Sequence, residues 1–217
     1  FGGQVMKNVA GYDVSRMLAG SMGTLGLLLD VRVKVLPRPF AETTLQFTIG
    51  EIDAIRKLNE WGGQPLPLSA SCWHDGVLSL RLSGAQAAVD AAVRQFGGDR
   101  VAGCDAFWAG VREQQHPFFA GEDALWRLSV PSTTSAIVLG GTQLIEWGGA
   151  QRWLRTGLDA ATIRRTVSAL GGHATLFRGG DKSAGVFQPL QPAVARIHER
   201  LKASFDPSHI FNPGRMY

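Results

Sequence analysis

The sequence has few cysteines, a small net charge and no long apolar run, and each shortage excludes a class of protein. Two of its 217 residues are cysteines, Cys72 and Cys104, without CxxC or paired-histidine spacing, so we expect free thiols. Lys and Arg number 22 against 18 Asp and Glu, without the basic block that nucleic-acid binding favours. No apolar run approaches the ~20 residues of a transmembrane helix. With 45% hydrophobic residues, the chain is expected to fold as a globular protein.

Familiar catalytic and metal-binding motifs are also absent. The histidines show no HExxH spacing, no GxSxG is present, and neither cysteine has an adjacent base. The sequence therefore predicts no metal site and offers no candidate for nucleophilic catalysis. It opens Phe-Gly-Gly-Gln, without an initiator Met or a signal-like segment, which predicts that it starts within a longer protein.

The spacing of apolar residues predicts an α+β fold, with helices covering an antiparallel sheet. Asp75-Gly76 can adopt positive φ at both positions and predicts a hairpin between two short strands. Hairpins occur without strict β-α-β alternation, which favours an antiparallel sheet. We expect strands at 43–49, 68–73, 77–82, 125–130, 143–147, 152–156 and 173–177, and helices at 52–61, 85–96, 105–115, 160–170 and 192–204. The caps of the second and fourth of these helices are expected to be Ser83 and Asp159.

The first 36 residues differ from the rest, since they are rich in glycine and small residues. Their last part, residues 25–36, alternates Val with Arg and Lys and predicts a further strand. Pro37 and Pro39 cannot continue a helix or a central strand, so we place a boundary there.

A glycine-rich loop precedes that strand. Gly20, Gly23 and Gly26 stand three residues apart, and such a loop leaves its amides open to a phosphate or a flat heterocycle. It is neither a P-loop nor a dinucleotide fingerprint, because no Lys-Ser or Lys-Thr follows and the glycines precede a strand. Cofactor contact and a tight structural turn both remain open. Lys7, Asn8, Tyr12 and Asp13 would line a polar site or form a loop with Asp13 as a helix cap.

Other residues carry two interpretations each. Arg127 lies on an expected strand, where it would form a salt bridge or bind an anion. His173 begins another strand, as a structural residue or a ligand. The tryptophans would pack the core, or an exposed subset would mark a subunit contact. They are Trp61, Trp73, Trp108, Trp126, Trp147 and Trp153.

Several longer motifs occur together along the whole chain. They are Val5-Met-Lys-Asn-Val-Ala-Gly-Tyr-Asp13, the loop Gly20–Gly26, Val35–Pro39, Gln64–Pro67, Arg112–Gln115, Pro117–Phe119, Leu125–Arg127, Trp147–Ala150, Gly171–Thr175 and Phe211–Tyr217. With them the sequence resembles FAD-linked oxidases of the vanillyl-alcohol oxidase/p-cresol methylhydroxylase superfamily. Within that superfamily it is similar to the FAD-binding E subunits of bacterial glycolate oxidases.

This resemblance implies three parts. Residues 1–39 would be the C-terminal part, or remnant, of an FAD-binding α+β domain, residues 40–190 a ferredoxin-like cap or substrate domain, and residues 191–217 a helix and tail returning to the FAD domain. FAD would contact the loop and the tail, while the half of the FAD domain with most flavin contacts would be missing. Without that half, the chain is expected to lose FAD and to be inactive alone. The flavin-contacting residues would be Gly20, Ser21, Gly23, Thr24, Gly26 and Asn212.

One departure bears on the chemistry. Relatives that oxidise 2-hydroxy acids carry a metal-binding His-Ala-Gly-Asp-Gly-Asn-x-His segment, and here Gly180 stands where the second His would be, after His173. The further Glu-His-Gly segment is not found. The resemblance then implies an electron-relay or structural flavin subunit, with oxidation in a catalytic flavoprotein partner and an iron–sulfur subunit completing the complex. It would lie in the cytoplasm, or at the inner face of the plasma membrane through that complex.

Two alternatives stay open. One is a self-sufficient FAD-dependent 2-hydroxy-acid dehydrogenase, with Arg127 and His173 as the candidate catalytic residues. The other is a non-enzymatic α+β module that binds a protein partner through its tryptophans.

Overall fold

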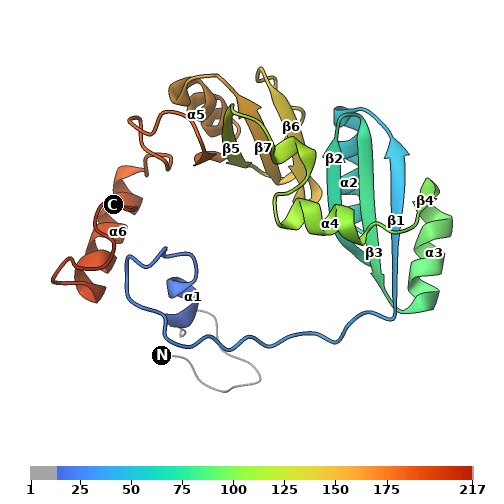
Figure 1. The fold of residues 1–217 in the computed structure, drawn as a ribbon, viewed down its shortest axis with the longest axis horizontal. Helices are drawn as coiled ribbons and strands as arrows, with labels where there is room; N and C mark the ends of the chain where they lie inside the picture. Colours follow the sequence, from blue (N-terminus) through green and yellow to red (C-terminus); the bar gives the residue numbers. More distant parts are fainter. Residues whose placement is uncertain (1–13, 217) are drawn as a thin grey trace. The chain divides into compact units, whose positions relative to one another are not determined.

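The computed structural model describes residues 14–216, and the chain divides into two compact units (Figure 1). One unit contains the described residues of Phe1–Leu36 together with those of Pro189–Tyr217. The other is Pro37–Gln188. We call them the loop–tail unit and the sheet unit. The first joins the two ends of the sequence, whereas the second is a continuous stretch.

The sheet unit is built on one antiparallel sheet of eight strands in the order β4-β1-β3-β2-β6-β7-β5-β8. The α+β prediction is confirmed. The strands are β1 (Ala41–Thr48), β2 (Leu68–His74), β3 (Val77–Gly84), β4 (Asp99–Val101), β5 (Ala124–Ser129), β6 (Thr142–Glu146), β7 (Gln151–Thr156) and β8 (His173–Arg178).

The first half of the sheet has the β-α-β-β-α-β order of a ferredoxin-like unit. Its helices, α2 (Glu51–Gly62) and α3 (Gln86–Phe96), pack on one face. Leu58 of α2 meets Leu78 and Leu80 of β3, and all three side chains are buried. The fold is thus consistent with the ferredoxin-like cap domain that the resemblance implies.

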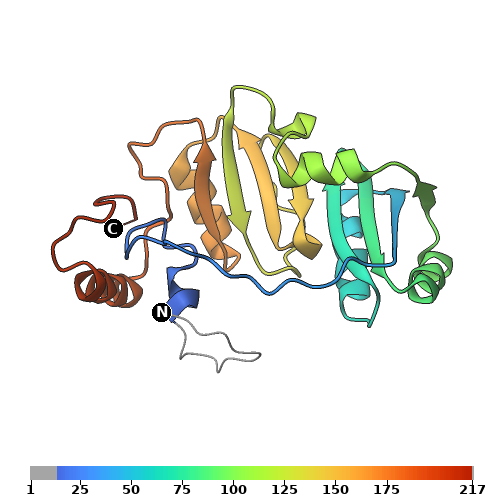
Figure 2. The same ribbon diagram turned by 60° about the horizontal axis from the view of Figure 1, so that its bottom comes forward.

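Helices lie on both faces of the sheet (Figures 1 and 2). On the same face as α2 and α3, the helix α5 (Ala160–Ala169) buries Ile163 and Val167 against β5 and β8. On the opposite face, α4 (Asp105–Arg112) and the 3-10 turn η1 (Pro117–Phe119) pack on Leu144 and Trp153. That face carries fewer helices, and polar side chains lie beside them.

Sequence periodicity predicts most of these elements correctly. The hairpin forms as expected, with φ of 46° at Asp75 and 77° at Gly76. Asp159 caps α5, since its carboxylate accepts a hydrogen bond from Thr162 N at 2.8 Å. Ser83 does not cap α3, because its hydroxyl donates to Glu42 Oε1 at 2.5 Å. The short strand β4 has no counterpart in the prediction.

Arg152 of β7 is completely buried, and its guanidinium binds main-chain carbonyls of the segments before and after β6. Its Nε donates to Gly149 O at 3.1 Å and its Nη1 to Ser135 O at 2.7 Å, while its Nη2 donates to Thr134 O. The Glu51 carboxylate lies farther off, at 3.9 Å. Burial lowers the Arg152 pKa, although Glu51 opposes this effect.

The loop–tail unit contains α1 (Val14–Leu18) and α6 (Pro192–Phe205) with the tail that follows. The strand predicted over residues 25–36 does not form, because no strand pairs with it among the described residues. Several of its apolar side chains are exposed, such as Leu29 at 89% and Val35 at 79%. Among residues 14–216, none of the helices has the length and apolarity needed to cross a bilayer.

Candidate functional site

The glycine-rich loop adopts two linked tight turns. Its Ser21 amide donates to Leu18 O at 3.1 Å, and its Thr24 amide donates to Ser21 O at 3.0 Å. Positive φ values of 83° at Gly20 and 72° at Gly23 explain why glycine is used there. The amides of Met22, Gly23, Leu25 and Gly26 have no acceptor among the described residues. The loop can therefore offer several main-chain donors to a ligand.

The two polar side chains of the loop have other roles. The Thr24 side chain is fully buried, and its hydroxyl donates to Ser21 O at 2.7 Å. Ser21 is also buried. Of the predicted flavin-contacting residues, these two have their amides engaged in the loop's turns and their side chains buried, so they shape the loop that presents the neighbouring amides.

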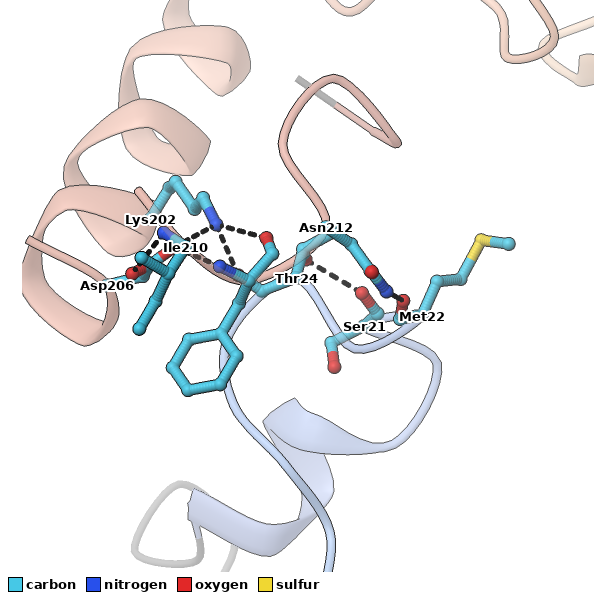
Figure 3. A network of polar contacts seen from close by, with 8 residues as sticks. Ser21, Met22, Thr24, Lys202, Asp206, Ile210 and Asn212 are labelled. Carbon is cyan, nitrogen blue, oxygen red and sulfur yellow. Dashed lines mark hydrogen bonds and ion pairs between the residues drawn. The ribbon is translucent and has the colours of Figure 1, made fainter. Parts of the chain in front are cut away.

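The tail folds back onto this loop (Figure 3). Asn212 donates from Nδ2 to Met22 O at 2.8 Å, across 190 positions of sequence. A Cβ atom at Gly23 would lie 2.8 Å from the same nitrogen, so only glycine permits this approach. Met22 and residues 212–215 line a shallow, open hollow beside this contact. The structure thus brings together the loop and the tail Asn that the sequence singled out.

One buried ammonium group joins the same segments. Lys202 Nζ, on the last turn of α6, donates to Thr24 O and to Phe211 O at 2.7 Å each. It also binds Asp206 Oδ2 at 2.5 Å, and Asp206 is 1% exposed. The Asp206 carboxylate accepts two amides of the tail, Ile210 N at 3.0 Å and Phe211 N at 2.9 Å.

The charge of Asp206 is stabilised by these donors. Burial by itself would raise the Asp206 pKa, but the hydrogen bonds from Lys202, Phe211 and Ile210 lower it to about 2. The carboxylate is therefore ionised at all pH values near neutrality, and its pairing with Lys202 is a permanent feature of the site.

Arg127 and His173 lie in the sheet unit, on neighbouring strands. Arg127 of β5 stands opposite Thr175 of β8, two residues after His173, so both side chains belong to the same face. The Arg127 side chain is half-buried and has no hydrogen bond or ion pair with any residue in 14–216, so the predicted salt bridge is not found there. His173 is exposed. This face can present a cation to an anionic ligand.

Gly180 is unsuited to histidine. Its φ is 67°, and a Cβ atom would lie 2.9 Å from Ala124 Cβ. The backbone after β8 thus explains in physical terms why the segment departs from the metal-binding pattern. In the described part of the chain, no three His, Cys, Asp or Glu side chains come close enough together to hold a metal ion.

The tryptophans mostly belong to the core. Trp61, Trp108, Trp126 and Trp153 are buried, and the partly buried Trp73 donates to Ile49 O. Trp147 alone among the six is largely exposed, at 72%, so the subset that could mark a contact is a single residue. Lys7, Asn8, Tyr12 and Asp13 lie outside the described residues.

Sequence reasoning missed Lys202 and Asp206. Lys202 looks like an ordinary helix cation, and the signal that could have marked it is the spacing of four residues to an acid just before the tail. Arg215 belongs to the tail motif Phe211–Tyr217, which by itself predicts no role for this side chain. It lines the hollow beside Asn212, and its guanidinium has no partner among the described residues.

A sheet unit of ferredoxin-like character, together with a glycine loop closed by the C-terminal tail, is the combination that the resemblance to FAD-linked oxidase subunits predicts. Comparison with known proteins finds a relative that matches the whole chain. The chain is 48% identical over all of its 217 residues to "Glycolate oxidase subunit GlcE" of Escherichia coli (strain K12). It is a relative of that subunit along its whole length, and it spans 61% of the length of GlcE. The resemblance indicated by the motifs is confirmed.

A second relative matches over a shorter region. The chain is 45% identical over 53 residues to "Glycolate oxidase subunit GlcD" of Bacillus subtilis (strain 168). That match covers 24% of this chain and 11% of GlcD. None of the protein-family models compared with the chain matches it.

Proposed function

We propose that this chain forms part of an FAD-binding subunit of a multi-subunit glycolate oxidase. The observation that carries the proposal is the contact between loop and tail, in which Asn212 binds Met22 within a loop that has several unbonded amides. The identity to GlcE, whose name is that of a glycolate oxidase subunit, supports it over the whole chain.

The residues present suit one side of a flavin site. The amides of Met22, Gly23, Leu25 and Gly26 would donate to acceptor atoms of the flavin. Asn212 Oδ1 has no donor among the described residues, and it would accept a hydrogen bond from the flavin. When bound, FAD would supply redox chemistry by accepting and passing on electrons, and the protein supplies binding and orientation.

Within such a complex, we propose the role of an electron-relay or structural flavin subunit. The backbone at Gly180 supports this role, because its positive φ and the closeness of Ala124 disfavour a histidine where the oxidising relatives carry their second metal-binding histidine. A catalytic flavoprotein subunit would oxidise the 2-hydroxy acid, and an iron–sulfur subunit would complete the assembly. By the same resemblance the complex would lie in the cytoplasm or against the inner face of the plasma membrane.

The test is the cofactor content of the full-length gene product. It should purify yellow, with about one FAD per subunit, and take up FAD again after removal. A colourless protein that binds no FAD would contradict the proposal. Glycolate oxidation should require co-expressed partner subunits, and full turnover by the isolated subunit would refute the relay or structural role.

A second candidate is a self-sufficient FAD-dependent 2-hydroxy-acid dehydrogenase. The observation that favours it is the unpartnered Arg127 on the same face as His173, since a half-buried guanidinium suits a carboxylate. This candidate predicts turnover by the full-length subunit without partners, lost in Arg127→Ala and in His173→Ala.

A further inference from the structure

The Lys202 ammonium group makes more polar contacts than a lysine on the surface of a helix requires. An ammonium group has three donors, and those of Lys202 are matched by Thr24 O, Phe211 O and the Asp206 carboxylate. The residue is 7% exposed, so little water competes for these donors. The first acceptor belongs to the glycine loop and the second to the tail, which are separated by most of the sequence.

These contacts form a closed ring (Figure 3). Lys202 binds the residue that follows Gly23 and the residue that precedes Asn212. Asn212 in turn binds Met22, which precedes Gly23. Lys202 and Asn212 thus provide two separate links between the loop and the tail side of the unit, and Gly23 lies between the two loop residues that they bind.

The loop's own hydrogen bonds cannot replace this ring. Ser21 N and Thr24 N donate to carbonyls of residues 18 and 21, which shapes the turns but leaves the loop unattached to the tail. The Asn212 link is exposed to water, whereas the Lys202 link is buried and charge-assisted. The buried link is therefore expected to contribute more to the register of loop and tail.

We propose that Lys202 is a positioning residue for the flavin site. It sets the loop amides and Asn212 in one arrangement through two main-chain carbonyls, and it needs no contact with the flavin itself. This inference rests on the proposed function, because it assigns Lys202 to the site in which FAD would bind.

The test compares FAD binding in variants of the full-length gene product. Lys202→Met/Asp206→Asn removes both buried charges, so that no unpaired charge unfolds the unit, and its asparagine oxygen can still accept from one of the two tail amides. Lys202→Arg keeps the charge, but a planar fork cannot reproduce three contacts at one point. Arg200→Met is the matched control, because it removes an exposed cation from the same helix.

The dissociation constant for FAD should rise about ten- to hundredfold in both Lys202 variants and stay unchanged in the control. The visible circular dichroism of residual bound flavin should also change, which a loss of folded protein alone would not produce. Either variant binding FAD with wild-type affinity and spectrum would overturn the role of Lys202 and leave the proposed function intact. A wild-type protein that binds no FAD would overturn both.

Discussion

Replacing Arg152 with Met tests how the sheet unit holds the connection before β6. Methionine keeps an apolar stem of similar length and removes the guanidinium that three carbonyls share. Those carbonyls belong to Gly149, Ser135 and Thr134. Because the side chain is completely buried, water cannot take the place of the lost donors without opening the structure.

The magnitude follows from these contacts. A hydrogen bond to a charged group contributes about 1.5–3 kcal/mol, so three such bonds would together contribute more than about 4 kcal/mol to the free energy of unfolding. Removing the cation also removes its own desolvation cost, which offsets part of that loss. We expect Arg152→Met to lower the free energy of unfolding by about 3–5 kcal/mol, a large fraction of the stability of a typical domain.

The assay is urea unfolding of the 217-residue chain, followed by tryptophan fluorescence. All six tryptophans lie between residues 61 and 153, so the signal reports the sheet unit alone. Arg56→Met is the control, because Arg56 pairs with Asp53 at the surface and should cost at most about 0.5 kcal/mol.

Glu51→Gln separates the ion pair from the carbonyl bonds. The Glu51 carboxylate is 3.9 Å from Arg152, and its pKa is raised because burial outweighs the attraction of the arginine. This change should cost less than about 1 kcal/mol. If Arg152→Met cost less than about 1 kcal/mol, or Glu51→Gln cost as much as Arg152→Met, the account of the buried arginine would be refuted.

Further predictions concern the thiols, pH, the loop and cofactor retention. Burial and the nearby Glu146 charge raise the Cys72 pKa to about 12, so a thiol reagent at pH 8 should modify at most one cysteine in the native chain and two in denaturant; two fast-reacting native thiols would contradict this. Asp206, with a pKa of about 2 against an ordinary ~3.9, stabilises the loop–tail unit above pH ~4, so hydrogen exchange of the Phe211 amide should accelerate as pH falls from ~4 towards ~2, after correction for intrinsic rates; unchanged protection would count against the pairing. Gly23→Ala should weaken FAD binding by the full-length product, whereas an equal affinity would show that the close approach to Asn212 is dispensable. The 217-residue chain should lose FAD on dialysis, because one loop and one tail provide too few contacts to offset immobilisation, and a retained stoichiometric flavin spectrum would refute this.

The sheet could be predicted from local patterns where burial imposes them. Strands such as β3 and β5 alternate or concentrate apolar residues because one or both faces are covered, and the Asp-Gly pair fixes the hairpin between β2 and β3. β4 has three residues, Asp-Arg-Val, and forms by pairing with β1 more than 50 positions away. Its short sequence contains too little periodicity to reveal that long-range pairing.

Residues 25–36 are the opposite case, because the sequence predicts a strand there that does not form. Their alternation of Val with Arg and Lys is typical of a strand, but a strand also needs a neighbour to accept and donate its main-chain hydrogen bonds. Among the described residues no such neighbour exists, and the segment has no regular structure. A local pattern shows that a segment is suited to a sheet, but it does not show whether a partner strand is present to pair with it.

The candidate site was predictable in part for a similar reason. Gly20 and Gly23 carry a local signal, because the sequence shows glycines where positive φ is needed, whereas Asn212 is indicated by the family resemblance of the tail. Lys202 has only a weak signal, its spacing of four residues from Asp206, since its three acceptors come together only after α6 and the tail fold against the loop. Because every residue has a main-chain carbonyl, the residue types in a sequence do not reveal which carbonyls act as acceptors.

Titration of the full-length gene product with FAD tests whether this loop and tail form the flavin site. We expect saturation at one FAD per subunit, with affinity lowered by Gly23→Ala and by Asn212→Ala, which disturb the two sides of the contact between loop and tail. A protein that binds no FAD, or that binds it equally well in both variants, would contradict the claim that this loop and tail form the flavin site.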